Sequence, residues 1–272
     1  MLRTRVITAL VLLAVLLAVL FSRSYLVFAL AITMFFAAAA WESFRLFGSR
    51  QPVVGAAVWT AALAFILSRN EPAQAKLLFG LCAAIWALRL APSLAIGLPP
   101  LDGIGNRLLN GIYGVAILGC FVAMAALYKH SALYLFSVLA LVWIADIGAY
   151  FSGKAFGKRK LAPSISPGKS WEGAIGGWLA VLVLAAASTL VPMLSDTFAA
   201  AVQRQWGWAV LAGVLTLLVA ASVVGDLFES QLKRRAGFKD SSKLLPGHGG
   251  VLDRIDALVP VLPLAVFIDS FM

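Results

Sequence analysis

Nine apolar runs follow one another along the chain and constrain its fold more than any other feature. A helix needs about 20 mostly apolar residues to cross the hydrocarbon core of a bilayer. Only 12% of the residues are charged and 62% are hydrophobic, and this charged share is about half that of a soluble domain. We therefore expect an all-α, polytopic integral membrane protein with about nine transmembrane helices. The expected spans are residues 6–21, 25–41, 53–68, 77–96, 111–128, 132–151, 173–194, 208–225 and 251–272.

No internal repeat or soluble segment interrupts this pattern, so we expect a single transmembrane domain over residues 1–272. Residues 1–130 form apolar N-terminal spans, whereas ionisable groups concentrate in residues 131–272, where we expect the chemistry. The basic start followed by an apolar run resembles a secretory signal, but no small-residue cleavage site follows it. We interpret this segment as the first transmembrane helix. Cys82 and Cys120 lie inside apolar runs, and no disulfide is expected.

The distribution of lysine and arginine predicts the orientation, because these residues are retained on the cytoplasmic side. With nine spans, the two most basic loops, 152–172 and 226–250, lie on the same side of the membrane. Placing them inside puts the N-terminus in the cytoplasm and the C-terminus outside. The net charge of +10 then reflects cytoplasmic loops that face anionic ligands or lipid head groups, and no nucleic acid is expected as a partner. We expect the protein in the cell's inner membrane.

Carboxylates cluster near the ends of the last two apolar runs. Asp226 ends the eighth run, and Glu229, Ser230 and Lys233 share its face if the helix continues. Asp253 and Asp256 are three residues apart at the start of the ninth run. A carboxylate at membrane depth is costly unless it faces a cavity, a cation or a metal. Oxygen ligands of this kind suit Mg²⁺, which binds through one or two carboxylates and substrate phosphates.

The loop between these two runs carries groups that suit an anion. Lysine and arginine side chains accompany a glycine-rich segment, 247–250, whose backbone N–H groups can approach a ligand closely. His248 lies within this segment and is either a hydrogen-bond donor to phosphate, a general acid or a structural donor. The alternative is that all these charges are interfacial, with lysines reaching toward water and carboxylates pairing with them. The candidate phosphate-binding side chains are Lys233, Arg234, Lys239 and Arg254.

The loop before the seventh run is a second candidate anion site. Its Gly168-Lys169-Ser170 sequence is not a P-loop, because Pro163 stands where the first glycine is required and no strand precedes it. Ser166 is expected to cap a helix that has Pro167 at its first position and continues through Lys169 and Glu172. A helix N-terminus with a lysine at the membrane boundary is an anion site, or simply a capped helix start.

Two segments resemble a known family. Residues 230–256, the signature segment, read SQLKRRAGFKDSSKLLPGHGGVLDRID and resemble the signature of the CTP:phosphatidate cytidylyltransferases, or CDP-diacylglycerol synthases. Residues 145–158 and 166–173 are also similar to that family, so the resemblance covers about the last 130 residues. It implies a membrane enzyme that joins CTP and phosphatidate into CDP-diacylglycerol, releases pyrophosphate and requires Mg²⁺.

The resemblance also implies roles for individual residues. Asp226 and Asp253 are expected as the main metal ligands, with Asp256 and Ser230 close by, and a second metal or a monovalent cation stays open. Catalytic roles are expected for Asp226, Asp253, Lys233 and His248. The expected substrate-binding residues are Ser166, Lys169, Glu172, Ser230, Arg234, Lys239, Asp240, Gly249, Gly250 and Arg254.

Other readings stay open beside this one. The first is a CTP-dependent polyprenol or lipid kinase, built on the same combination of metal and lysines. The second is an ion-coupled transporter, for which carboxylates inside the membrane are typical, although here the charge concentrates in one half of the chain. A scaffold without activity would leave the clustered acids unexplained, and a homodimer is an open possibility for the assembly.

Overall fold

The structure is a computed structural model that describes residues 2–69 and 75–272. The first helices are α1 (Leu2–Phe21), α2 (Tyr25–Leu46), α3 (Pro52–Ser68), α4 (Lys76–Ile85), a π-helical turn at Trp86–Leu90, α5 (Ala91–Ile96), α6 (Ile104–His130) and α7 (Ala132–Phe156). Two strands follow, β1 (Lys160–Ala162) and β2 (Ser166–Ser170). The chain then forms α8 (Trp171–Thr189), a 3₁₀ turn at Pro192–Leu194, α9 (Phe198–Arg235), α10 (Leu252–Ile255) and α11 (Leu258–Asp269).

The architecture of a polytopic helical membrane protein is confirmed, whereas the expected total of nine spans is not. Among the described residues, six helices are long and apolar enough to cross a membrane. Three further apolar helices, Ile7–Phe21, Pro52–Ser68 and Leu258–Asp269, are shorter. Each expected span coincides with a helix, but the helix ends differ from the predicted ends by several residues. The prediction of one domain over the whole chain stays a prediction.

The fourth span is continuous despite Pro92. Helices α4 and α5 are joined through the π-helical turn, and together Lys76–Ile96 are long enough to cross the membrane. Proline lacks the N–H that an α-helix needs, and a wider turn directly before it accommodates the missing hydrogen bond. Arg89, which interrupts the apolar run in the sequence, lies within this turn.

Helix α9 carries Asp226 well inside the helix. It bends at Gly207, whose φ of 82° lies in the left-handed region that glycine tolerates, and then continues without a break to Arg235. The eighth helix therefore extends beyond its apolar run, which is the condition for Asp226 and the residues after it to share one face. Asp226, Ser230 and Lys233 lie on one face as the helical spacing predicts.

The loop before α8 corrects two expectations. Residues 166–170 form β2, which pairs antiparallel with β1, so the chain contains a short hairpin that the all-helical prediction lacked. Ser166 is consequently not a helix cap. The residue before a proline favours extended backbone, and Gly168 is a poor helix former, so the helix starts later. Ser170 caps α8 instead, and its side chain accepts a hydrogen bond from the N–H of Gly173.

The last apolar run is divided where Asp256 and Ala257 form a turn between α10 and α11. Pro260 has no N–H to donate to the carbonyl of Asp256, four residues earlier, so a continuous helix would leave that carbonyl unpaired. The turn makes Asp253 and Asp256 part of a short, irregular segment, whereas the sequence suggested the start of a long helix.

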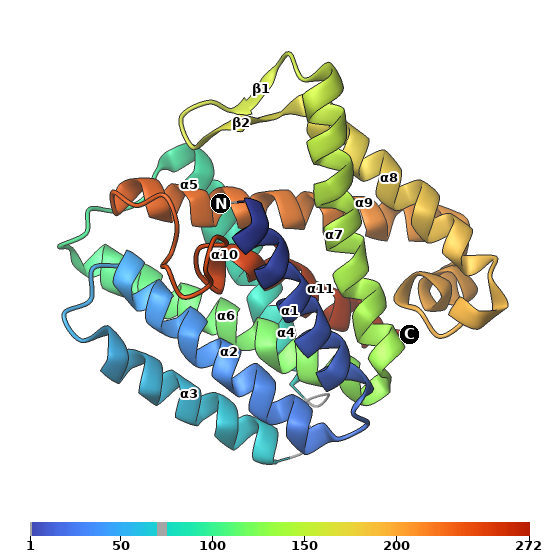
Figure 1. The fold of residues 1–272 in the computed structure, drawn as a ribbon, viewed down its shortest axis with the longest axis horizontal. Helices are drawn as coiled ribbons and strands as arrows, with labels where there is room; N and C mark the ends of the chain where they lie inside the picture. The colour runs from blue at the N-terminus through green and yellow to red at the C-terminus, as the bar shows by residue number, and fades with distance from the viewer. Residues whose placement is uncertain (1, 70–74) are drawn as a thin grey trace.

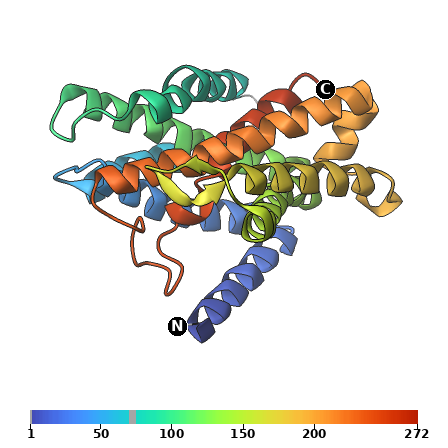
Figure 2. The same cartoon turned by 90° about the horizontal axis from the view of Figure 1, so that it is seen from above.

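The helices pack around a core in which α6 and α11 are largely buried. Glycines allow α7 and α8 to approach closely, since a Cβ at Gly177 would lie 2.4 Å from the carbonyl oxygen of Ala145. In Figure 1 the β-hairpin lies at the top, α5 and the end of α9 at the left, and the C-terminus at the right. Figure 2 shows that α1 projects from the body of the molecule. The loops that carry the candidate site thus lie away from the C-terminus.

Candidate active site

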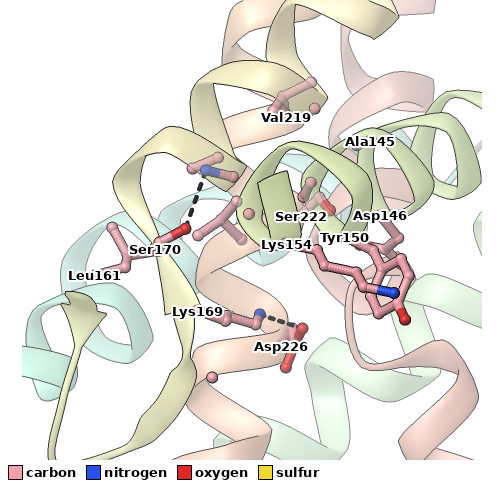
Figure 3. A pocket seen from close by; sticks show the side chains of 17 residues that line it. Ala145, Asp146, Tyr150, Lys154, Leu161, Lys169, Ser170, Val219, Ser222 and Asp226 are labelled. Carbon is pink, nitrogen blue, oxygen red and sulfur yellow. Dashed lines mark hydrogen bonds and ion pairs between the residues drawn. The ribbon is translucent and has the colours of Figure 1, made fainter. Parts of the chain in front are cut away.

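Lys169 and Asp226 bring the β-hairpin and α9 together. The Nζ of Lys169, on β2, forms an ion pair with Oδ2 of Asp226, and Ser230 Oγ donates a hydrogen bond to Oδ1 of Asp226 at 3.3 Å. Figure 3 shows Lys169 and Asp226 pointing toward one another at the edge of a cavity. Lys169 is therefore held beside Asp226 by a strand of the hairpin, and not by a helix that begins at Ser166.

This first cavity, the membrane cavity, has a volume of about 420 Å³ and lies between α7, the hairpin, α8 and α9. Its wall is mostly small and apolar, including Ala149, Val219 and Val223. Four aspartate and lysine side chains also line it: Asp146, Lys154, Lys169 and Asp226. The cavity thus combines an apolar interior with two lysines and two carboxylates.

Asp253 is held by a dense set of donors. Oδ1 accepts a hydrogen bond from Lys233 Nζ at 2.6 Å. Oδ2 accepts from the N–H of Gly250 at 2.7 Å and from both the N–H and the hydroxyl of Ser241, each at 2.8 Å. Burial raises the pKa of the Asp253 carboxyl, but these hydrogen bonds outweigh it and hold the pKa below its usual range. Asp253 is therefore an ionised carboxylate at neutral pH.

Lys233 connects Asp253 to a second acid, because its Nζ also forms an ion pair with Glu229 one helical turn earlier. Glu229 is completely buried, and Lys233 is its ion-pair partner in the described part of the chain. An unpartnered buried acid is costly, so the contacts of Lys233 stabilise both Glu229 and Asp253.

Asp256 lies close to Asp226 on the neighbouring helix. Its backbone carbonyl packs so closely against Gly225 that a Cβ there would lie 2.5 Å from the oxygen. Burial, together with the charge of Asp226, raises the pKa of the Asp256 carboxyl to about 8. A nearby cation would relieve this repulsion and favour the ionised form.

The donor set is compatible with Mg²⁺ bound partly through substrate. Within residues 2–69 and 75–272, no three His, Cys, Asp or Glu side chains lie close enough together to hold a metal ion alone. The neighbouring carboxylates of Asp226 and Asp256 nevertheless offer oxygen ligands, and Mg²⁺ usually takes one or two carboxylates and completes its shell with water and phosphate. The expected trio of Asp226, Asp253 and Asp256 is therefore not a preformed metal cage.

A second cavity, the loop cavity, has a volume of about 540 Å³ and is formed by residues 239–249 together with Arg254. Four of its lining residues carry side chains that can donate to an anion: Lys239, Lys243, His248 and Arg254. His248 Nδ1 is buried without a hydrogen-bond partner among the described residues. Gly249 also lines this cavity and lies against Asp253, because a Cβ at Gly249 would be 2.6 Å from Oδ2.

Several predicted site residues lie elsewhere. Glu172 lines neither cavity, and its carboxylate accepts hydrogen bonds from the N–H groups of Lys158 and Arg159, so it fixes the base of the hairpin. Ser166 lies in β2, and Arg234 is exposed on α9. Asp240 lines the loop cavity and Ser230 contacts Asp226, as expected from their places in the signature segment. The catalytic and binding roles of these residues stay predictions.

The sequence reasoning did not assign a site role to two further carboxylates. Asp146 lines the membrane cavity on α7, and Glu42 on α2 contacts the signature segment. Asp146 lies inside the apolar run 132–151 and Glu42 directly follows the run 25–41, and a single acid in such a place signals a functional residue at membrane depth.

Comparison with known proteins identifies the family of the chain. Residues 3–271 match the Cytidylyltransferase family. The Phosphatidate cytidylyltransferase of Haemophilus influenzae is 38% identical, with 97% of this chain and 96% of that protein covered. The protein of the same name from Pseudomonas aeruginosa is 43% identical, with 97% and 95% covered. A match of this extent includes the apolar N-terminal half as well as the signature segment. The chain belongs to the cytidylyltransferase family.

Proposed function

We propose that this protein transfers the cytidylyl group of CTP to phosphatidate, forming CDP-diacylglycerol and pyrophosphate. Its near full-length relatives bear the name of this activity. The observation that carries the proposal is the arrangement of the two cavities. The loop cavity is basic and adjoins Asp253, whereas the membrane cavity is largely apolar and adjoins Asp226. Helix α9 and the loop that leads to Asp253 connect the two cavities.

The membrane cavity fits the lipid substrate. Lys169 and Lys154 supply positive charge for a phosphate monoester, while the apolar wall formed by α7, α8 and α9 can contact the first part of the acyl chains. The remainder of the chains stays in the bilayer. Lys169, which pairs with Asp226, gains a phosphate as an alternative partner when the lipid binds.

The loop cavity fits the triphosphate of CTP. Lys239, Lys243 and Arg254 provide cationic donors, and the glycine-rich segment exposes backbone to the cavity. Arginine can contact phosphate oxygens in a bidentate manner, which orients the triphosphate as well as attracting it. For cytidylyl transfer, the α-phosphorus of CTP must lie near Asp226 and Asp253, the carboxylates that adjoin the two cavities.

The reaction needs positioning and charge stabilisation rather than a strong base. A phosphate oxygen of phosphatidate forms a bond to the α-phosphorus of CTP, and the bond from that phosphorus to the bridging oxygen breaks, which releases pyrophosphate. The nucleophile is already an anion, so His248 is not required as a general base. The cationic side chains hold two mutually repelling anions in contact and stabilise the leaving pyrophosphate.

We expect Asp226, Asp253 and Asp256 to hold Mg²⁺. The ion supplies charge neutralisation and a template for the phosphates of CTP. In the protein itself, Lys233 and the donors to Oδ2 keep Asp253 ionised for this role. A second cation is compatible with the proposal and is not required by it.

We place the site at the cytoplasmic face of the cell's inner membrane, because the basic loops hold both cavities and CTP is supplied in water. The N-terminus is then cytoplasmic and the C-terminus outside. Single cysteines introduced at exposed Lys243 and Ser270 can test this with a membrane-impermeant thiol reagent in intact cells. Both native cysteines are buried, so their background labelling will be low. Labelling at position 270 alone agrees with the proposed orientation, and labelling at 243 alone reverses it.

The direct test is product formation by purified protein in micelles that contain phosphatidate. With CTP and Mg²⁺ we expect CDP-diacylglycerol and pyrophosphate in equal amounts, and neither product when the metal is chelated. Folded protein that forms neither would leave the kinase and transport hypotheses as the first alternatives. Partners beyond CTP and phosphatidate, including a second copy of the chain, are not needed for this test.

A further inference from the structure

Glu42 is a completely buried carboxylate on α2, within an apolar transmembrane helix. Among the described residues, no lysine, arginine or histidine forms an ion pair with it. A buried charge without a cation must be compensated by hydrogen bonds. The hydrogen-bond partners of Glu42 therefore indicate its role.

All four hydrogen-bond donors to Glu42 come from the signature segment, about 200 residues later in the chain. Oε1 accepts from Ser242 Oγ at 2.5 Å and from the N–H of Val251 at 3.0 Å. Oε2 accepts from the N–H of Leu252 at 2.6 Å and from Ser241 Oγ at 3.2 Å. The carboxylate thus fixes both ends of the loop 241–252, which surrounds the loop cavity.

The same donors lead directly to Asp253. Ser241 lies between the two acids: its N–H donates to Asp253 Oδ2 at 2.8 Å, and the one hydrogen of its hydroxyl is shared between that oxygen, at 2.8 Å, and Glu42 Oε2, at 3.2 Å. Leu252, whose N–H donates to Glu42, immediately precedes Asp253. Displacing the loop from Glu42 would therefore displace the donors that orient Asp253.

Gly250 shows how closely the loop is fitted to this carboxylate. A Cβ at position 250 would lie 2.3 Å from Glu42 Oε1 and 2.1 Å from Ser241 Oγ. Real Cβ atoms do not approach so closely, so only glycine fits here. The requirement for glycine at 250 is thereby explained by packing against Glu42, whereas the sequence suggested contact with substrate.

We infer that Glu42 is a positioning residue: from α2 it anchors the loop 241–252 and so sets the geometry of Asp253 and of the loop cavity. It lines neither cavity. The kinetic part of this inference rests on the proposed function. The structural part, the anchoring of the loop, does not.

Glu42→Gln is the sharpest substitution, because it keeps the shape of the side chain. Each carboxylate oxygen of Glu42 accepts from a backbone N–H, Val251 on one side and Leu252 on the other. The glutamine NH₂ therefore meets a backbone N–H in either orientation, and one buried donor loses its acceptor. Thr33→Val is the matched control, since it removes a hydrogen bond within α2 at a site that does not touch the loop.

Limited trypsin digestion measures the anchoring independently of activity. Lys243 is exposed on the loop, and Lys239 is exposed two residues before the loop begins. In Glu42→Gln we expect cleavage at these lysines to be at least about tenfold faster than in the wild type, as the loss of a buried hydrogen bond implies. Thr33→Val should be cleaved at the wild-type rate. Wild-type cleavage in Glu42→Gln would overturn the inference, even if the wild-type protein showed no cytidylyltransferase activity.

Steady-state kinetics test the positioning. We expect Glu42→Gln to lower kcat and to raise KM for CTP, each by about tenfold, with KM for phosphatidate unchanged. A purely structural defect would reduce the amount of active enzyme and leave both KM values as in the wild type, and that result would overturn the positioning role. If Glu42→Gln does not fold, Ser242→Ala removes one loop donor instead, and a smaller change in the same direction is expected. Wild-type cleavage and KM in Ser242→Ala would overturn the inference.

Discussion

The Nζ of Lys233 lies 2.6 Å from Oδ1 of Asp253, so α9 and the segment that begins α10 are joined by an ion pair between two largely buried side chains. Lys233 also pairs with Glu229, which lies four residues earlier on its own helix. One cation therefore compensates two acids. The remaining oxygen of Asp253 accepts hydrogen bonds from the loop, so Lys233 and the loop together fix a carboxylate that would help to hold Mg²⁺.

Replacing Lys233 with methionine should damage both stability and activity. Two carboxylates would lose their cation in a buried environment, and breaking such a pair from one side costs about 3–5 kcal/mol. We expect a clearly lower midpoint of thermal unfolding in detergent and no turnover. Lys233→Arg should retain more stability because it keeps the charge. A wild-type unfolding midpoint in Lys233→Met would contradict the role of this lysine.

Asp253→Asn should abolish turnover while the protein still inserts and folds. The amide cannot serve as an ionised metal ligand, and in either orientation its NH₂ faces a hydrogen-bond donor, Lys233 or the loop N–H groups. Activity with phosphatidate and CTP, measured beside the elution volume in size-exclusion chromatography, checks both parts. Asp102→Asn, at an exposed acid between α5 and α6, is the control. Near-normal turnover in Asp253→Asn would remove this residue from the metal centre.

Lysines of the two cavities should affect different substrates. Lys169→Met removes a cation from the membrane cavity and should raise KM for phosphatidate, whereas Lys243→Met should raise KM for CTP, each by about tenfold for a lost charged hydrogen bond. Lys160→Met changes an exposed lysine of the same hairpin that lines neither cavity. Equal effects of Lys169→Met and Lys243→Met on both KM values would contradict the assignment of the cavities.

The contacts of Asp196 predict that the stability of the protein depends on pH. Asp196 lies at the ends of the helices that are opposite to the candidate site. It contacts His130 Nε2 at 2.9 Å and accepts from Ser131 Oγ at 2.5 Å, which joins the turn between α6 and α7 to the segment before α9. Partial burial raises the pKa of Asp196, but the hydrogen bonds from Ser131 and His130 outweigh it, so the pKa lies below its ordinary value. The resulting stabilisation is present above the unfolded pKa, about 3.9, and is lost as the pH falls through the lower folded value.

Thermal unfolding between pH 7 and pH 3 measures this contribution. The wild type should lose more stability on acidification than Asp196→Asn, in which the titrating group is absent. Parallel curves for the two proteins would show that this contact does not contribute.

The helices and the clustering of the late acids could be predicted because both follow from local patterns. Apolar runs of bilayer length give the spans, and the helical spacing places Asp226, Ser230 and Lys233 on one face. The signature segment correctly indicated the family. It also contains the residues that surround the loop cavity, several of which were predicted as site residues.

The remaining features depend on contacts between distant segments. A helix cap and a strand residue both have extended backbone, and Pro167 favours that conformation at Ser166 in either case. The local sequence therefore could not distinguish the hairpin from a helix start. Glu42 is about 200 residues from the donors that it binds, and no local pattern relates the two. Its position at the end of an apolar run signalled a function but did not reveal the partner.

The most direct measurement of the central claim follows the two ends of the triphosphate separately. CTP labelled at the α-phosphorus, or in a parallel reaction at the γ-phosphorus, is incubated with the purified protein, phosphatidate and Mg²⁺, and the lipid fraction is counted. Cytidylyl transfer predicts the α-label in the lipid and the γ-label in pyrophosphate. The γ-label in the lipid, with CDP in solution, would show a kinase and contradict the account.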